Sequence, residues 1–139
     1  RRLFSGDLMQ ETRYARAWAS WENTLASIDN EGPGGESPAE YARAFARLEN
    51  HYFINAGFLQ EDGQILNQVG RIAHIPGVIV QGRYDMICPP VSAWNLHKAW
   101  PASQFKMVGK AGHALSEPGI SAELVQTMDR LRQNSSLSL

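Results

Sequence analysis

The second half of the chain contains two short strand-like runs, each followed by a glycine-containing loop and a helical pattern. Val78-Ile79-Val80 precedes Gly82, and Phe105-Lys106-Met107-Val108 precedes Gly109. A short continuous apolar run is typical of a parallel strand buried on both faces, and repetition of strand, loop and helix predicts an α/β fold. Two strands alone leave ladder groups unpaired and one face uncovered. The 139 residues are therefore expected to hold the end of a larger, mostly parallel sheet.

A helix is expected after each strand. The segment from Val91 to Trp100 has a helical pattern that Pro101 ends, and a final helix begins at about Glu117. The expected buried face of the final helix consists of Ile120, Leu124, Met128 and Leu131.

The first half of the chain is expected to be helical. Apolar residues recur at steps of three and four from Glu11 to Asp29, and again from Pro38 to about Ile54. Gly32-Pro33-Gly34-Gly35 separates the two segments, and Ser37 is expected to cap the second helix. The expected buried stripes are Tyr14, Trp18, Trp21, Leu25 and Ile28 in the first helix, and Tyr41, Phe45, Leu48 and Tyr52 in the second.

Composition argues against several classes of partner. Thirteen basic and 14 acidic residues give a formal net charge of -1, which provides no attraction to nucleic acid or anionic lipid. No apolar run approaches the roughly 18 residues of a membrane span, and no signal-peptide core follows the N-terminal arginines. The single cysteine, Cys88, cannot form an internal disulfide. We therefore expect a cytoplasmic protein without nucleic-acid or membrane partners.

Two residues that can carry chemistry follow the ends of the predicted strands. Asp85 lies in the loop after the first strand, and His113 lies in the loop after the second. Parallel sheets place ligands and catalytic groups at the carboxyl ends of their strands. A carboxylate beside an imidazole fixes its tautomer and stabilises the imidazolium that forms when the histidine takes a proton. Singly, each is more often an ordinary turn or surface residue, but their order at successive strands favours a catalytic pair.

Four ordered motifs extend over nearly the whole chain. They are Ala17-Trp18-Ala19-Ser20-Trp21-Glu22, Ala46-Arg47-Leu48-Glu49-Asn50-His51-Tyr52-Phe53, Gly82-Arg83-Tyr84-Asp85, and Gly112-His113 followed by Glu117-Pro118-Gly119. With these motifs the chain resembles prolyl iminopeptidases, serine aminopeptidases of the α/β-hydrolase superfamily that release N-terminal proline from peptides. The resemblance implies a helical cap-domain portion in residues 1–65 and the C-terminal part of the catalytic domain in residues 66–139. It also implies that Asp85 and His113 are the acid and base of a catalytic triad.

The serine of that triad is expected upstream of Arg1. The Gly-x-Ser-x-Gly turn that presents the nucleophile in α/β-hydrolases is absent from the 139 residues. The nearest sequence, Gly35-Glu36-Ser37-Pro38-Ala39, lacks the second glycine and a preceding strand. Because the serine precedes the acid in these enzymes, we expect a truncated chain that is inactive alone.

The resemblance further implies that Glu22 and Glu49 bind the free amino group of a peptide that begins with proline. One or two carboxylates recognise such a secondary ammonium through charge-assisted hydrogen bonds. Each glutamate follows an apolar residue of its helix and so lies at the margin of the expected buried stripe. Without the resemblance, glutamates in such positions are more often simply solvated.

No metal or cofactor is expected. His51, His74 and His97 share no ligand spacing with one another or with cysteine. Cys88 lies three residues after Asp85 but has no activating base of its own, so we expect a bystander thiol.

Two alternatives stay open. With a different cap, the same scaffold hydrolyses esters, amides or epoxides, because a fold does not fix a substrate. Alternatively, the chain is a non-catalytic fragment that folds with a complementary chain or through self-association.

Overall fold

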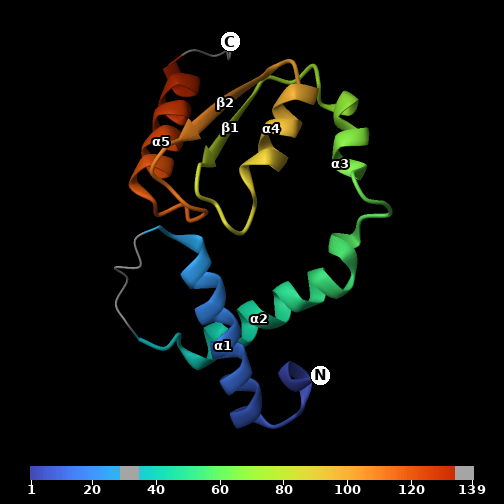
Figure 1. Cartoon of the computed structure of the whole chain (residues 1–139), viewed down its shortest axis with the longest axis vertical. Coiled ribbons are helices and arrows are strands. Elements are labelled where there is room, and N and C mark those ends of the chain that lie inside the picture. Colours follow the sequence, from blue (N-terminus) through green and yellow to red (C-terminus); the bar gives the residue numbers. More distant parts are fainter. Residues whose placement is uncertain (29–34, 134–139) are drawn as a thin grey trace. The chain divides into compact units, whose positions relative to one another are not determined.

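The structure is a computed structural model that describes residues 1–28 and 35–133. The chain forms helices and a parallel sheet of two strands, which confirms the prediction of an α/β chain at this level (Figure 1). It divides into two compact units, one formed by Arg1–Thr24 with Asp29–Asp62 and the other by Leu25–Ile28 with Gly63–Leu139. The predicted break at residues 32–34 lies outside the described residues.

Two helices form the first unit. Helix α1 spans Leu8–Ala26, of which the last two residues are counted with the second unit, and helix α2 spans Ala39–Ile54. Two short 3-10 turns flank them, η1 at Arg2–Phe4 and η2 at Ala56–Phe58. The end of α2 at Ile54 agrees with the sequence prediction, whereas the predicted end of the first helix at Asp29 is wrong, because α1 ends at Ala26 and neither Ser27 nor Ile28 is helical.

The two helices begin differently from the predictions. Helix α1 starts three residues before Glu11 because Asp7 Oδ1 accepts the N–H groups of Met9 at 2.9 Å and Gln10 at 3.2 Å. The predicted serine cap of α2 is wrong, since Pro38 occupies the cap position and no side chain caps this helix. The Ser37 carbonyl instead accepts a hydrogen bond from Arg16 Nε of α1 at 3.0 Å.

Alanines form most of the core of the first unit. Ala15 and Ala19 of α1 and Ala42 and Ala46 of α2 are completely buried, and Leu3 completes the cluster. Small side chains allow two helices to approach closely, so the large residues lie beside the contact. Of the predicted stripes, Tyr14, Trp18 and Phe45 are partly buried against this cluster.

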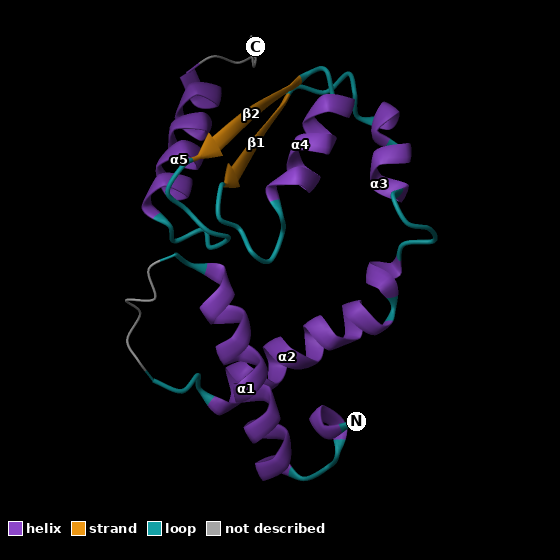
Figure 2. Cartoon of the chain, in the orientation of Figure 1, coloured by secondary structure: helices purple, strands orange, loops and turns teal. Residues whose placement is uncertain are grey.

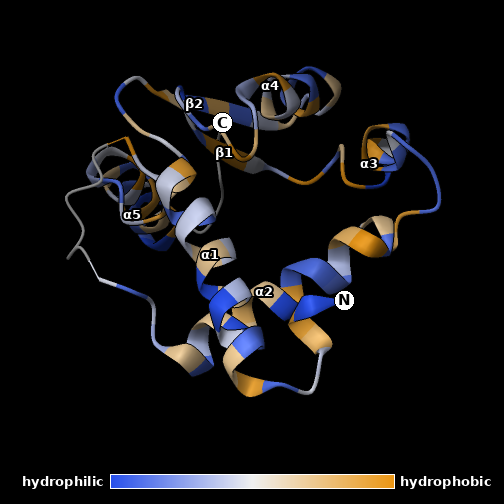
Figure 3. Cartoon of the chain, turned by 60° about the horizontal axis from the view of Figure 1, so that its bottom comes forward, coloured by the Kyte–Doolittle hydropathy of each residue, from blue (hydrophilic) through white to orange (hydrophobic). Residues whose placement is uncertain are grey.

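The other predicted stripe residues show where helical periodicity misleads. Hydrophobic and hydrophilic residues alternate along α2 (Figure 3), but several of its large apolar residues are exposed. The prediction of burial was wrong for Trp21, Ile28, Tyr41, Leu48 and Tyr52, which are all exposed.

A parallel sheet of two strands forms the centre of the second unit. Strand β1 (Gly77–Gly82) pairs with β2 (Ser103–Val108) along its full length. Helix α4 (Pro90–Ala99) connects the strands, α5 (Pro118–Gln133) follows β2, and the short α3 (Gln64–Asn67) precedes β1 (Figure 2). The predicted strand–helix–strand–helix order is therefore confirmed.

Helices α4 and α5 cover opposite faces of the sheet (Figures 1 and 2). Phe105 of β2 contacts Trp94 and His97 of α4, with both pairs of ring centroids 5.5 Å apart. Because side chains alternate along a strand, Val108 faces the other side, where a Cβ added at Gly119 of α5 would lie 2.5 Å from it. The sheet is thus sandwiched between helices, as a parallel sheet requires.

Burial in this unit is less complete than predicted. Val78, Ile79 and Val80 of β1 are half-buried rather than buried on both faces, since only β2 pairs with this strand among the described residues. In α5, Ile120 is buried as predicted, but Met128 is exposed.

Candidate active site

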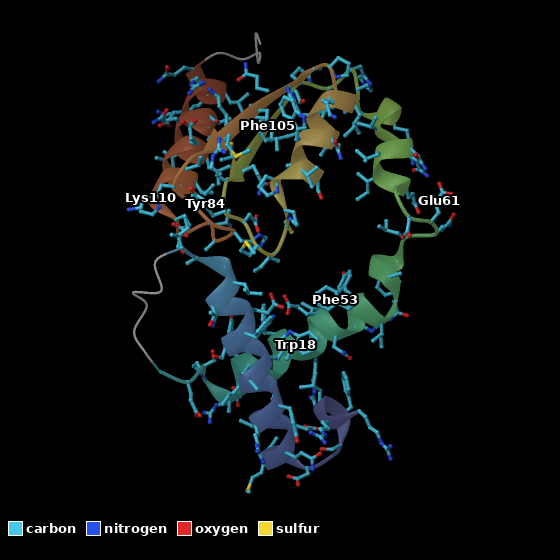
Figure 4. All side chains as sticks on the ribbon, in the orientation of Figure 1. Trp18, Phe53, Glu61, Tyr84, Phe105 and Lys110 are labelled. Carbon is cyan, nitrogen blue, oxygen red and sulfur yellow. The ribbon has the colours of Figure 1, made fainter. Side chains whose placement is uncertain are left out.

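The two strands end side by side, which brings their following loops together. Gly82, the last residue of β1, lies opposite Val108, the last residue of β2. The pairing continues beyond the strands because the Arg83 N–H donates to the Val108 carbonyl, and the Tyr84 N–H donates to the Ala111 carbonyl, both at 3.0 Å. Tyr84 is labelled at this end of the sheet in Figure 4. The loops that carry Asp85 and His113 are therefore held next to each other.

Asp85 and His113 meet at this end of the sheet. His113 Nδ1 lies 3.0 Å from Asp85 Oδ2, within hydrogen-bonding distance. Since an ionised carboxylate can only accept, the proton of this hydrogen bond belongs to Nδ1, and Nε2 is left unprotonated in the neutral ring. The imidazole side chain is 40% exposed, whereas the carboxylate is only 6% exposed. This is the geometry of a general base that an acidic residue orients.

Four hydrogen bonds fix the carboxylate of Asp85. Its Oδ1 accepts the backbone N–H groups of Ile87 at 3.0 Å and Cys88 at 2.7 Å. Its Oδ2 accepts Gln81 Nε2 at 3.0 Å in addition to His113 Nδ1. Each oxygen therefore has two partners, so the carboxylate cannot rotate without losing several of them.

These contacts also determine the charge of Asp85. Burial is the largest single influence and raises the pKa of this carboxyl. Hydrogen bonds from Cys88, His113 and Ile87, with the attraction of a positive His113, together outweigh burial and hold the pKa below its ordinary value. Asp85 is accordingly an anion at neutral pH, and it can stabilise an imidazolium.

Acidification is expected to weaken the fold through Asp85. A carboxyl whose pKa is lower in the folded protein stabilises the fold above its unfolded-state pKa, and this contribution disappears as the pH falls through the folded-state pKa. For Asp85 the loss begins near the ordinary value of 3.8 and continues below it. We expect the free energy of unfolding, measured with urea, to fall less steeply between about pH 4 and pH 2 in Asp85→Asn than in the unchanged protein. Identical slopes would contradict this role.

The loop that carries His113 is held through its backbone. The N–H groups of His113 and Ala114 both donate to the carbonyl of Ala26, at 2.7 and 2.8 Å. The buried carboxylate of Glu117 accepts the N–H of Ile28 at 2.9 Å and that of Gly112 at 3.3 Å. Residues 25–28 belong to the second unit, so this unit contains its own anchor for the histidine loop.

Two glycines are required where the loops approach each other. A Cβ added at Gly82 would lie 2.7 Å from the carbonyl oxygen of Ala111 and closer still to that of Gly112. A Cβ added at Gly112 would lie 2.7 Å from the carbonyl oxygen of Ala26. In contrast, a Cβ at Gly109 would meet nothing within 4 Å. Of the glycines in the predicted histidine loop, only Gly112 is needed for close packing.

Gln81 and Glu117 are residues of this site to which the sequence analysis assigned no role. Both are buried polar side chains, and Gln81 Nε2 also donates to the Cys88 carbonyl at 3.2 Å. A polar residue at the end of an otherwise apolar strand was an available signal for Gln81. No comparable signal existed for Glu117, because its acceptor role depends on a backbone N–H 89 residues away.

Cys88 carries no sign of nucleophilic activation. Burial, and then the negative charge of Asp85, raise the pKa of its thiol. The thiol is therefore held in its protonated, weakly nucleophilic form.

Glu22 and Glu49, the other predicted site residues, lie in the first unit on α1 and α2. Both side chains are half-buried. Glu49 Oε2 accepts a hydrogen bond from the indole Nε1 of Trp18 at 2.7 Å. The structure thus places the predicted acid and base in one unit and the two predicted amine ligands in the other.

Residues 1–28 and 35–133 contain no group of three His, Cys, Asp or Glu side chains arranged to hold a metal ion. None of the described helices is both long enough and apolar enough to span a bilayer.

Comparison with known proteins identifies the relatives of this chain. It is 47% identical over 134 residues to a proline iminopeptidase of Arabidopsis thaliana, which covers 95% of this chain and 35% of the plant protein. It is 48% identical over 132 residues to a probable proline iminopeptidase of Leptolyngbya boryana, covering 94% of this chain and 41% of that protein. The proline iminopeptidase of Xanthomonas citri is 46% identical over 131 residues, covering 93% of the chain and 42% of the bacterial protein. The chain is related to the proline iminopeptidases.

The match to proline iminopeptidases confirms the resemblance predicted from the four motifs. It extends over nearly the whole chain but spans only about two fifths of the length of these relatives, in their C-terminal portion. No model of a known protein family matches the chain.

Proposed function

We propose that this chain forms part of a serine aminopeptidase that releases N-terminal proline from peptides. In this proposal, residues 1–65 are a helical portion of the cap and residues 66–139 are the C-terminal part of an α/β-hydrolase catalytic domain. The observation that carries the proposal is the hydrogen bond between His113 Nδ1 and Asp85 Oδ2 at the ends of adjacent parallel strands. The similarity to proline iminopeptidases supports the choice of substrate.

The proposed reaction needs a serine from a portion of the protein outside these 139 residues. Its hydroxyl attacks the carbonyl carbon of the N-terminal proline while His113 Nε2 takes the hydroxyl proton, and Asp85 stabilises the resulting imidazolium. The imidazolium then protonates the amine of the next residue, which leaves as the shortened peptide. A water molecule, deprotonated by the same histidine, hydrolyses the prolyl ester and restores the serine.

Specificity for a free N-terminus is proposed to come from Glu22 and Glu49. The amine of an N-terminal proline is a secondary ammonium at neutral pH, and carboxylates bind such a cation by charge-assisted hydrogen bonds. A peptide whose amino group is blocked has no charge to offer these carboxylates. The single cysteine also fits a reducing compartment, so a cytoplasmic location is part of the proposal.

The proposal is tested by comparing two substrates in the full-length protein, a prolyl anilide and a neutral acyl ester. Glu49→Gln is expected to lower kcat/KM for the prolyl anilide by about 10- to 100-fold, because a hydrogen bond to a charged group contributes about 1.5–3 kcal/mol. Cleavage of the ester should be nearly unchanged, since it carries no ammonium.

Glu40→Gln provides the matched control, because Glu40 is an exposed residue near the start of the same helix. It should leave both activities unchanged. Equal losses on both substrates in Glu49→Gln would argue against an amine-binding role. Cleavage of esters without any cleavage of prolyl anilides by the unchanged protein would instead favour a different hydrolase.

A further inference from the structure

The hydrogen bond between Trp18 and Glu49 joins the two helices of the first unit. The indole Nε1 of Trp18 on α1 donates to Glu49 Oε2 on α2 at 2.7 Å, a short distance for a nitrogen donor and a carboxylate. The two residues are 31 positions apart, so the contact results from the packing of the helices and not from local sequence. Both side chains are half-buried, which limits competition from water for this hydrogen bond.

The indole ring is itself held in place. Trp18 packs against the buried alanine cluster. It also stacks with Phe53, with ring centroids 6.1 Å apart and an angle of 30° between the planes, and both residues are labelled in Figure 4. Phe53 follows Glu49 by one helical turn, so Trp18 contacts two successive positions on one face of α2. The donor therefore points at the carboxylate from a fixed ring.

We infer that Trp18 is a positioning residue for Glu49. This inference rests on the proposed function, in which Glu49 binds the ammonium group of the substrate. A carboxylate has about four acceptor positions, and the indole N–H occupies one of them on Oε2. An indole donates without carrying a charge, so it restricts the carboxylate and leaves its negative charge available to a cation. A lysine or arginine in the same place would compete with the substrate ammonium.

The expected benefit is tighter binding of the substrate amine. A glutamate side chain that is already ordered loses less conformational freedom when the ligand binds. Removing the indole donor should therefore weaken binding of the ammonium and leave the later chemical steps unchanged.

The test is Trp18→Phe in the full-length protein. Phenylalanine keeps an aromatic ring for the packing and the stack with Phe53 but has no N–H to donate. We expect KM for the prolyl anilide to rise by about tenfold with kcat nearly unchanged, and kcat/KM for the neutral acyl ester to stay the same. Trp21→Phe is the matched control, since Trp21 lies on the same helix with 66% of its surface exposed, and it should change neither activity.

A double-mutant cycle separates positioning from a general structural effect. In the Glu49→Gln background, Trp18→Phe should add less than about twofold to the loss on the prolyl anilide, because the charge that Trp18 orients is already absent. A parallel decrease on both substrates, or an unchanged KM in Trp18→Phe, would overturn the inference.

The outcomes also separate the inference from the function on which it rests. If Glu49→Gln discriminates between the substrates and Trp18→Phe does not, only the role of Trp18 fails. If Glu49→Gln does not discriminate, the amine-binding role of Glu49 fails, and the inference about Trp18 fails with it.

Discussion

Replacing Asp85 with asparagine in the full-length protein is expected to lower kcat for a prolyl anilide by about 10⁴-fold, with little change in KM. The backbone N–H groups of Ile87 and Cys88 need an acceptor, so they orient the amide oxygen of the new side chain toward themselves. The amide nitrogen then faces His113 Nδ1 as a donor. The imidazole must turn to the tautomer with its proton on Nε2, and this tautomer cannot accept the proton of a serine.

The same substitution also affects Gln81. Its Nε2 donates to Asp85 Oδ2, and the amide nitrogen of an asparagine in that position would present a second donor. Some rearrangement of Gln81 is therefore expected, with a moderate decrease in stability.

Asp62→Asn is the control for the loss of a charge, because Asp62 is an exposed aspartate in a loop. Comparing the steady-state kinetics of Asp85→Asn with those of Asp62→Asn would separate the catalytic effect from the loss of a charge. A decrease in kcat of less than about tenfold would contradict the role of Asp85 as the acid of a triad.

The second large effect is expected from Gly82→Ala. The added methyl group would overlap the backbone carbonyls of Gly112 and Ala111, which cannot rotate away as a flexible side chain can. The loops would have to separate, which would stretch the hydrogen bond from the Tyr84 N–H to the Ala111 carbonyl. We expect a loss of stability of about 3 kcal/mol, at the upper end of the range for overpacking, and a loss of most of the activity.

Gly109→Ala is the matched control for this substitution. A methyl group at Gly109 would meet no atom within 4 Å, although the residue directly follows β2. Its free energy of unfolding should stay within about 0.5 kcal/mol of the unchanged protein. If thermal unfolding showed equal effects of the two substitutions, the close approach of the loops at Gly82 would be refuted.

The pairing of Asp85 with His113 was predictable because it depends on topology. Once two parallel strands are recognised, their carboxyl ends must lie at one edge of the sheet, and residues just beyond them become neighbours. The strand–helix order and the end of α2 at Ile54 followed similarly from local patterns. Such features need only the order of the elements and no knowledge of side-chain packing.

The core of the first unit could not be predicted in the same way. Periodicity identifies the apolar side of a helix but does not show which residues of that side face a neighbouring helix. Here the alanines next to the predicted stripes, such as Ala19 and Ala46, form the contact, and Trp21 and Leu48 remain exposed. The cap of α2 failed for a related reason, since the backbone of Ser37 bonds to Arg16 of another helix. Contacts between distant elements decided both cases.

The backbone carbonyl that accepts hydrogen bonds from the loop carrying His113 limits how the polypeptide can be divided. Ala26 precedes His113 by 87 positions, yet its carbonyl is the acceptor for the N–H groups of both His113 and Ala114. A piece of the gene starting at Gly63 would encode Asp85 and His113 but not this acceptor. Protein engineering by fragment complementation would therefore have to keep residues 25–28 covalently or non-covalently present, because a contiguous C-terminal half is not a structurally complete one.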